Sequence, residues 1–203
     1  MKNYRSRIFD FKTIKRPVEQ GSLLVSEPFL QERYFKHAVI SLVDLAADNG
    51  TMGVVLNNRT GLMLHEVVDE IKPSRQVNVY CGGPLSHDRL FFLHTLGPDI
   101  VSGASEYAPG LYIGGDFASV VEYVNSGYPM NGVLRFFIGY TGWSPGQLAE
   151  ELDNDVWAVA NPDAVPAAVL LSNHGDTLWH TVVRTMGPDY RLWRLHPMST
   201  RAN

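Results

Sequence analysis

The sequence predicts an α+β protein in which a mainly antiparallel β-sheet is flanked by helices in a single layered domain. Apolar runs of strand length come in pairs, and turn signals such as Asp48-Asn49-Gly50 separate them. Segments with apolar residues at helical spacing stand between these pairs, which favours hairpins and helices over a regular βαβ series. The 203 residues are 45% hydrophobic and 19% charged, enough to bury one sizeable core.

The strands are expected where short apolar runs end at turn residues. In chain order these runs are residues 21–26, 37–43, 52–56, 77–81, 90–94, 111–113 and 133–140. The second and third runs predict one hairpin, and the fourth and fifth predict another through Gly82-Gly83-Pro84. The polar residues 57–61 and the stretch 97–109 are expected as loops.

The helices are expected where the apolar period changes to three and four residues. They are residues 64–71, a segment from Asp116 to Gly127, a helix beginning near Ser144, and a segment from Asp176 to Gly187. At the third helix, Ser144 can act as the N-cap, Pro145 fits the first helical position and Gln147 can close a capping box. This helix start follows directly on the strand 133–140, so Trp143 and Gln147 are expected where a strand passes into a helix.

Composition excludes several classes of protein. No apolar run approaches the ~20 residues of a membrane-spanning helix, and the charged N-terminus lacks a signal-peptide core, so we expect a cytoplasmic protein with no membrane contact. The single cysteine, Cys81, excludes an intrachain disulfide. The net charge of −4 does not favour broad nucleic-acid binding.

Residues 1–20 form a separate basic arm in front of a domain that spans residues 21–203. The cations of the arm include Arg5, Arg7, Lys12, Lys15 and Arg16. Two interpretations are open, because the arm can contact DNA phosphates or pack on its own domain or a partner subunit.

The candidate binding site lies where glycines and aromatic residues gather at strand ends. It comprises Asn57, Gly82, Gly83, Pro84, His94, Tyr140, Gly142, Trp143 and Gln147. If these strands are neighbours, their ends line one shallow polar-aromatic pocket for a small ligand or a partner protein. The alternative is that the glycines serve turns and that Trp143 covers the core.

No catalytic constellation, metal site or cofactor motif stands out. Cys81 and His94 are the candidates for reactive groups, although the structural interpretation is a small buried thiol and a partly buried imidazole. His65-Glu66 lacks the second histidine of a zinc helix. Glu150 and Glu151 are adjacent on a helix and are interpreted as surface charge.

Several motifs, in their order and spacing, resemble the bacterial YqgE/AlgH family over about residues 20 to 190. They are Gly21-Ser-Leu-Leu-Val-Ser-Glu-Pro28, Phe35 with Ala38-Val39-Ile40, Gly53-Val-Val-Leu-Asn57, Gly82-Gly-Pro84, Leu93-His94, Gly139-Tyr-Thr-Gly-Trp-Ser-Pro-Gly-Gln-Leu148, Glu151-Leu152, Trp157, Trp179 and Gly187. The resemblance implies a layered domain with a largely antiparallel sheet, and it implies no established reaction or cofactor. Members often carry the label of transcriptional regulator, which rests on association and not on a DNA-binding motif.

The sequence therefore predicts a non-enzymatic regulatory or adaptor protein that binds an unidentified partner protein or small ligand. The alternatives are a transcriptional regulator that contacts DNA through the basic arm, and an enzyme of unknown reaction at the strand ends.

Overall fold

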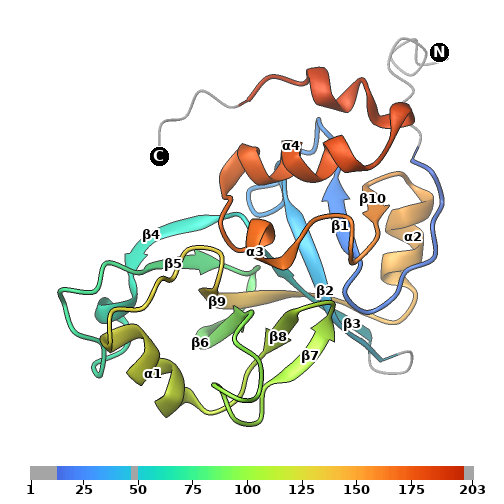
Figure 1. The fold of residues 1–203 in the computed structure, drawn as a ribbon. Coiled ribbons are helices and arrows are strands. Elements are labelled where there is room, and N and C mark those ends of the chain that lie inside the picture. Colours follow the sequence, from blue (N-terminus) through green and yellow to red (C-terminus); the bar gives the residue numbers. More distant parts are fainter. Residues whose placement is uncertain (1–12, 47–49, 199–203) are drawn as a thin grey trace, which may run out of the picture.

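The computed structural model describes residues 13–46 and 50–198 (Figure 1). Within these residues, ten strands form one sheet. The strands are β1 (Leu23–Ser26), β2 (Val39–Ala46), β3 (Gly50–Val55), β4 (Arg59–Met63), β5 (Asn78–Cys81), β6 (Leu85–His94), β7 (Ser105–Ala108), β8 (Leu111–Ile113), β9 (Leu134–Trp143) and β10 (Trp157–Ala160). The helices are α1 (Phe117–Asn125), α2 (Gln147–Asp153), α3 (Ala167–Leu170) and α4 (Gly175–Thr185), with 3₁₀ turns η2 (Leu64–Glu66), η3 (Pro188–Tyr190) and η4 (Trp193–Leu195).

The sheet is antiparallel except at one pair, which confirms the predicted α+β fold. The main path runs β10-β1-β2-β3-β9-β6-β8-β7, and β4 joins it through β5. β5 lies parallel to β9, with Val79 opposite Phe136. Every other pair is antiparallel.

Helices cover the two ends of the sheet (Figure 1). At one end, α4 packs Trp179 against β1 and β2. At the other end, α1 buries Val120 and Val124 against β5, β6 and β9. A third apolar cluster lies under α2 and contains Trp143 and Trp157. Among the residues described, no helix is both long and apolar enough to cross a membrane.

Most predicted elements are confirmed. The predicted hairpin of residues 38–56 is the β2–β3 pair, residues 111–113 form β8, and the predicted strand 133–140 corresponds to β9, which continues to Trp143. The Asp116 carboxylate caps α1 by accepting the Ser119 N–H at 2.9 Å, as predicted for this residue type.

The predicted helix over residues 64–71 is wrong. Only Leu64–Glu66 form a 3₁₀ turn, and irregular turns follow. The backbone forms separate turns, in which the Val67 and Val68 N–H groups donate to the Leu64 carbonyl and the Ile71 N–H donates to the Val68 carbonyl. These turns bury Leu64, Val68 and Ile71, so the apolar spacing is accommodated without a continuous helix.

The predicted hairpin of residues 77–81 and 90–94 is also wrong, because β9 lies between β5 and β6. Phe136 of β9 pairs with Val79 on one side and with Phe92 on the other. The connection through Gly82 does not fold back as a turn. Instead the Gly82 N–H donates to the Ile138 carbonyl at 2.9 Å and the Gly82 carbonyl accepts from Val55 at 2.8 Å.

Two predicted loops contain strands. Residues 59–63 form β4 although they are mostly exposed, because they pair with the edge of β5 and need no apolar face. Residues 105–108 form β7 against β8. The helix after β9 begins later than predicted, at Gln147, with Gly146 as its N-cap and no side-chain cap. Half of the predicted capping box is present, since the Gln147 Oε1 accepts from the Ser144 N–H at 3.1 Å.

Candidate functional site

The turn from β9 into α2 is organised around one carboxylate, that of Glu151. Its Oε2 accepts hydrogen bonds from the indole N–H of Trp143 at 2.8 Å and of Trp157 at 2.6 Å. Its Oε1 accepts from the Gln147 side-chain amide at 3.0 Å. Trp143 and Trp157 are 5% and 2% exposed, so Glu151 satisfies two donors that water barely reaches. We call this arrangement the Glu151 clamp.

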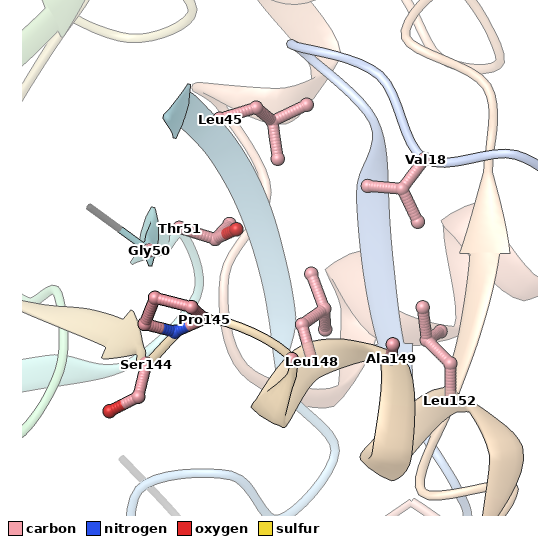
Figure 2. Close-up of a pocket in the computed structure, with 10 residues that line it drawn as sticks. Val18, Leu45, Gly50, Thr51, Ser144, Pro145, Leu148, Ala149 and Leu152 are labelled. Carbon is pink, nitrogen blue, oxygen red and sulfur yellow. The ribbon is translucent and has the colours of Figure 1, made fainter. Parts of the chain in front are cut away.

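An apolar groove lies beside the clamp, between α2 and the β2–β3 hairpin. We call it the α2 groove. It has a volume of about 330 Å³. In Figure 2 the side chains of Val18, Leu45 and Leu148 converge on it from three segments far apart in the sequence. Leu152 and Ala149 complete its α2 wall, and Ala149 is exposed.

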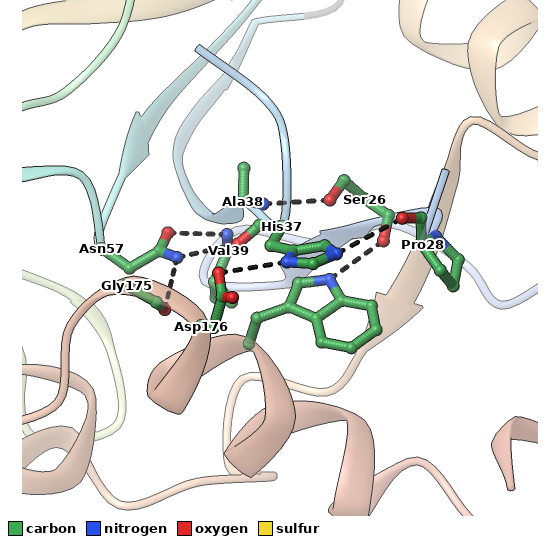
Figure 3. A network of polar contacts seen from close by, with 9 residues as sticks. Ser26, Pro28, His37, Ala38, Val39, Asn57, Gly175 and Asp176 are labelled. Atoms are coloured by element: carbon green, nitrogen blue, oxygen red, sulfur yellow. Dashed lines mark hydrogen bonds and ion pairs between the residues drawn. The ribbon is translucent and has the colours of Figure 1, made fainter. Parts of the chain in front are cut away.

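Asn57 lies at the centre of a second polar network, which joins β1, β2 and α4 (Figure 3). Its Oδ1 accepts from the Val39 N–H at 3.0 Å, and its Nδ2 donates to the carbonyls of His37 at 2.8 Å and Gly175 at 2.9 Å. The residue is 2% exposed. All three side-chain hydrogen bonds therefore lie inside the protein, which is the arrangement of a structural asparagine.

His37 extends this network towards α4. Its Nδ1 lies 3.0 Å from a carboxylate oxygen of Asp176, and its Nε2 lies 3.3 Å from the carbonyl of Pro28. Its backbone has φ of +49°, a left-handed conformation that non-glycine residues rarely adopt. The ring packs 4.8 Å from that of Trp179, whose indole N–H donates to the Ser26 carbonyl at 3.0 Å.

The strand-end residues Gly82, Gly83, Tyr140 and Gly142 do come together. A Cβ on Gly82 would lie 2.2 Å from the Gly139 carbonyl oxygen, and one on Gly83 would lie 2.3 Å from the Tyr140 carbonyl. These glycines therefore permit close backbone approach to β9, and the Gly82 N–H that an oxyanion would need is already bound. Pro84 follows them and is exposed.

Cys81 and His94, the candidate reactive groups, make separate contacts. The Cys81 thiol donates to the Gly83 carbonyl at 3.5 Å. His94 is fully buried between the rings of Phe92 and Tyr112 and donates from Nε2 to the Gly114 carbonyl at 3.1 Å. Burial lowers the pKa of His94, and the Gly114 hydrogen bond opposes that effect.

The described end of the basic arm packs on the domain. Lys15 donates to the carbonyl of Leu152 and lies 3.2 Å from the Asp153 carboxylate. Arg16 donates to the Asn161 side-chain oxygen at 3.4 Å. The remaining cations proposed for DNA contact, Arg5, Arg7 and Lys12, lie outside the described residues.

The predicted binding residues thus occupy separate places in the fold. Trp143 and Gln147 meet at the clamp, the glycines meet Tyr140 on β9, and Asn57 and His94 lie elsewhere. The sequence analysis did not predict the Glu151 clamp, because a glutamate on a short helix is typical of surface charge. The interpretation of Glu151 as surface charge is wrong, since its side chain is half-buried and accepts from two indoles. The two tryptophans at positions 143 and 157 were the available signal, since buried indoles need an acceptor.

Among the residues described, no group of three or more histidine, cysteine, aspartate or glutamate side chains is placed to hold a metal ion.

Comparison with known proteins finds relatives that match most of the chain. Residues 23–191 match the model of the AlgH-like family. A UPF0301 protein of Parabacteroides distasonis is 38% identical over 184 residues, which cover 91% of each chain. A UPF0301 protein of Bacteroides thetaiotaomicron is 32% identical over 195 residues, or 96% of each chain.

Solved structures share the fold. The solution structure of the AlgH protein from Pseudomonas aeruginosa has a TM-score of 0.68 at 25% identity and covers 94% of this chain and 100% of its own. A crystal structure of a protein from Corynebacterium diphtheriae has a TM-score of 0.70 at 22% identity, with 95% and 99% coverage. With a family model that matches most of its length and relatives that align almost end to end, this chain belongs to the AlgH-like family.

Proposed function

We propose that this chain is a non-enzymatic regulatory or adaptor protein that binds a partner protein through the α2 groove. The observation that carries the proposal is the groove itself, whose aliphatic side chains come from the arm, the β2–β3 hairpin and α2. Burial of aliphatic side chains from a partner in such a groove is favourable by about 25 cal/mol for each Å² removed from water.

The Glu151 clamp supports this assignment because it fixes the groove's α2 wall. Two hydrogen bonds from Glu151 hold α2 against Trp143 and Trp157, and a third joins Gln147 to Glu151 within the helix, so the wall is ordered before a partner arrives. A preformed surface loses less conformational entropy on binding. The non-enzymatic part of the proposal is supported by the Cys81 thiol and the His94 Nε2, each of which contacts a backbone carbonyl and not a base or a nucleophile.

The test uses a photoreactive amino acid, p-benzoylphenylalanine, in place of Ala149, in cells that naturally produce the protein. Ala149 is exposed on the groove wall, so irradiation should give a crosslinked species of defined mass. The same replacement at Ala118, an exposed alanine on α1, is the matched control and should not give this crosslinked species.

Purified proteins then give the affinity. A149R places a long charged side chain in the groove and should weaken binding of the crosslinked partner at least tenfold, while A118R should leave it unchanged. The proposal is wrong if position 149 gives no specific adduct, or if A149R and A118R bind the partner equally well.

A further inference from the structure

Arg135 is a buried cation with no carboxylate partner among the described residues. It lies on β9 and is 4% exposed. Its Nη1 donates to the carbonyls of Leu56, Leu170 and Asn173 at 2.8, 3.3 and 2.9 Å, and its Nη2 donates to Leu171 at 2.6 Å. All these acceptors are neutral, whereas buried charges are usually paired with an opposite charge. The Nε–H makes no hydrogen bond with a described residue, so the guanidinium retains an unused donor.

A second arginine shares the same aromatic ring. The Arg135 guanidinium lies 4.1 Å from the centre of the Tyr80 ring, and that of Arg59 lies 6.0 Å from it. The Arg59 Nε donates to the Tyr80 hydroxyl at 3.3 Å. Arg59 stands on β4 and is exposed. Two positive charges are thus held on one tyrosine, one buried and one open to solvent.

These charges face a small polar cavity of about 170 Å³. We call it the arginine pocket. Its polar walls include Asn78, Asn131 and Ser172, and no acidic side chain lines it. The side-chain amides of Asn78 and Asn131 make no hydrogen bonds with described residues and remain available as donors.

The electrostatic effect of the two arginines extends beyond the cavity. Burial is the largest cause that lowers the pKa of His174, and the charges of Arg59 and Arg135 lower it further. Burial lowers the pKa of Arg135 to about 10, with a smaller contribution from Arg59, so Arg135 stays protonated at neutral pH. The pocket therefore carries excess positive charge under ordinary conditions.

We propose that the arginine pocket binds the oxyanion of a small ligand, a phosphate or a carboxylate group, between Arg59 and Arg135. Guanidinium groups present planar N–H donors that match both oxyanions, and hydrogen bonds between two charged groups are the stronger kind. The cavity is smaller than the roughly 300–1,000 Å³ of sites for drug-sized ligands, so the occupant is a small ion or metabolite. The pocket shares no lining residue with the α2 groove and is a separate site.

The experiment titrates the ¹⁵N-labelled full chain with sodium phosphate, and separately with sodium acetate, at an ionic strength held constant with sodium chloride. We expect a saturable shift of the Arg59 Nε–H signal. Saturation by phosphate alone assigns a phosphate ligand, saturation by acetate alone assigns a carboxylate, and saturation by both assigns the shared oxyanion chemistry. Shifts that never saturate, or that sodium chloride alone reproduces, overturn the proposal.

Two substitutions distinguish binding in the arginine pocket from non-specific attraction of anions to surface arginines. R59Q removes an exposed side chain and should weaken binding about tenfold or more while the chain stays folded. R89Q removes an exposed arginine that does not line the pocket, and binding should not change. Arg135 is left intact because its hydrogen bonds to Leu170, Leu171 and Asn173 hold the end of α3. Equal binding by R59Q and the unaltered chain, or equal weakening by R59Q and R89Q, would contradict the site.

Discussion

At the scale of single residues, Glu151 shows how a charged side chain becomes structural. Its neighbour Glu150 sits on the same helix and is exposed, whereas Glu151 accepts from two buried indoles and one amide. The difference arises from direction alone, because successive helical residues point about 100° apart.

Replacement of Glu151 with alanine should therefore lower the free energy of unfolding by about 3 kcal/mol, because two buried indole donors lose their acceptor. Glu150→Ala is the matched control and should change stability by about 0.5 kcal/mol or less. Urea denaturation of both variants measures the difference. Equal stability of the two variants would show that the clamp contributes nothing.

Part of the candidate site could be predicted from single residues, and part could not. The strand-to-helix placement of Trp143 and Gln147 followed from the local pattern, since capping and turn residues lie close in sequence. Arg135 could not be recognised, because it interrupts an apolar strand and its acceptors at Leu56 and Leu170–Asn173 come from distant segments. Long-range partners of a buried charge leave no local signal.

At the scale of elements, β9 depends on close contact with the chain that follows β5. Gly82 and Gly142 both have an ordinary backbone φ, yet their surroundings differ. An added Cβ at Gly82 meets the Gly139 backbone oxygen at 2.2 Å. An added Cβ at Gly142 would lie 3.2 Å from its nearest neighbour, a terminal methyl carbon of Leu85. That side chain is partly exposed and can move aside.

Gly82→Ala should consequently lower the free energy of unfolding by about 3 kcal/mol, because strand backbones must separate to admit the methyl group. Gly142→Ala should stay within about 1 kcal/mol of the parent chain. Thermal or urea unfolding gives both values. If Gly142→Ala proves the more damaging, close backbone approach is not the role of Gly82.

The elements that sequence predicted best are those with a local apolar signal. β2 and β9 are long strands with mostly apolar residues, β3 ends in two buried valines, and α1 and α4 have clear apolar faces. β4 lacks such a face, and residues 64–71 bury their apolar side chains from separate turns, although the spacing of those side chains is also that of a helix. The parallel β5–β9 pair likewise depends on topology and not on composition.

At the scale of the whole molecule, buried and half-buried histidines link stability to pH. Burial is the first cause that lowers the pKa of His94, His174, His180 and His196 below the ordinary value of 6.5. The unfolded chain therefore binds more protons than the folded chain below about pH 6.5. Their contribution to stability is complete above that pH and is lost as the pH falls towards the lowered folded values.

The free energy of unfolding should accordingly fall as the pH is lowered through about 6.5 towards the lowered pKa values of the folded chain. His94→Gln keeps a donor for the Gly114 carbonyl and removes the titrating ring, so it should reduce this fall. The same replacement at the exposed His87 serves as control. Urea unfolding at several pH values tests the expectation, which fails if the parent chain and His94→Gln show the same pH dependence.

The place of β1 in the sheet has a consequence for synthesis on the ribosome. β1 is fully buried between β2 and β10, and Leu23 pairs with Ala160. One edge of this early apolar strand therefore stays unpaired until β10, more than 130 positions later, has been synthesised. An open apolar strand edge is a template for aggregation, so chains that stall or are cut before β10 expose the segment to misassembly and proteolysis. Only after translation has passed β10 can the open edge of β1 be paired within the chain, and the risk of aggregation through that edge then ends.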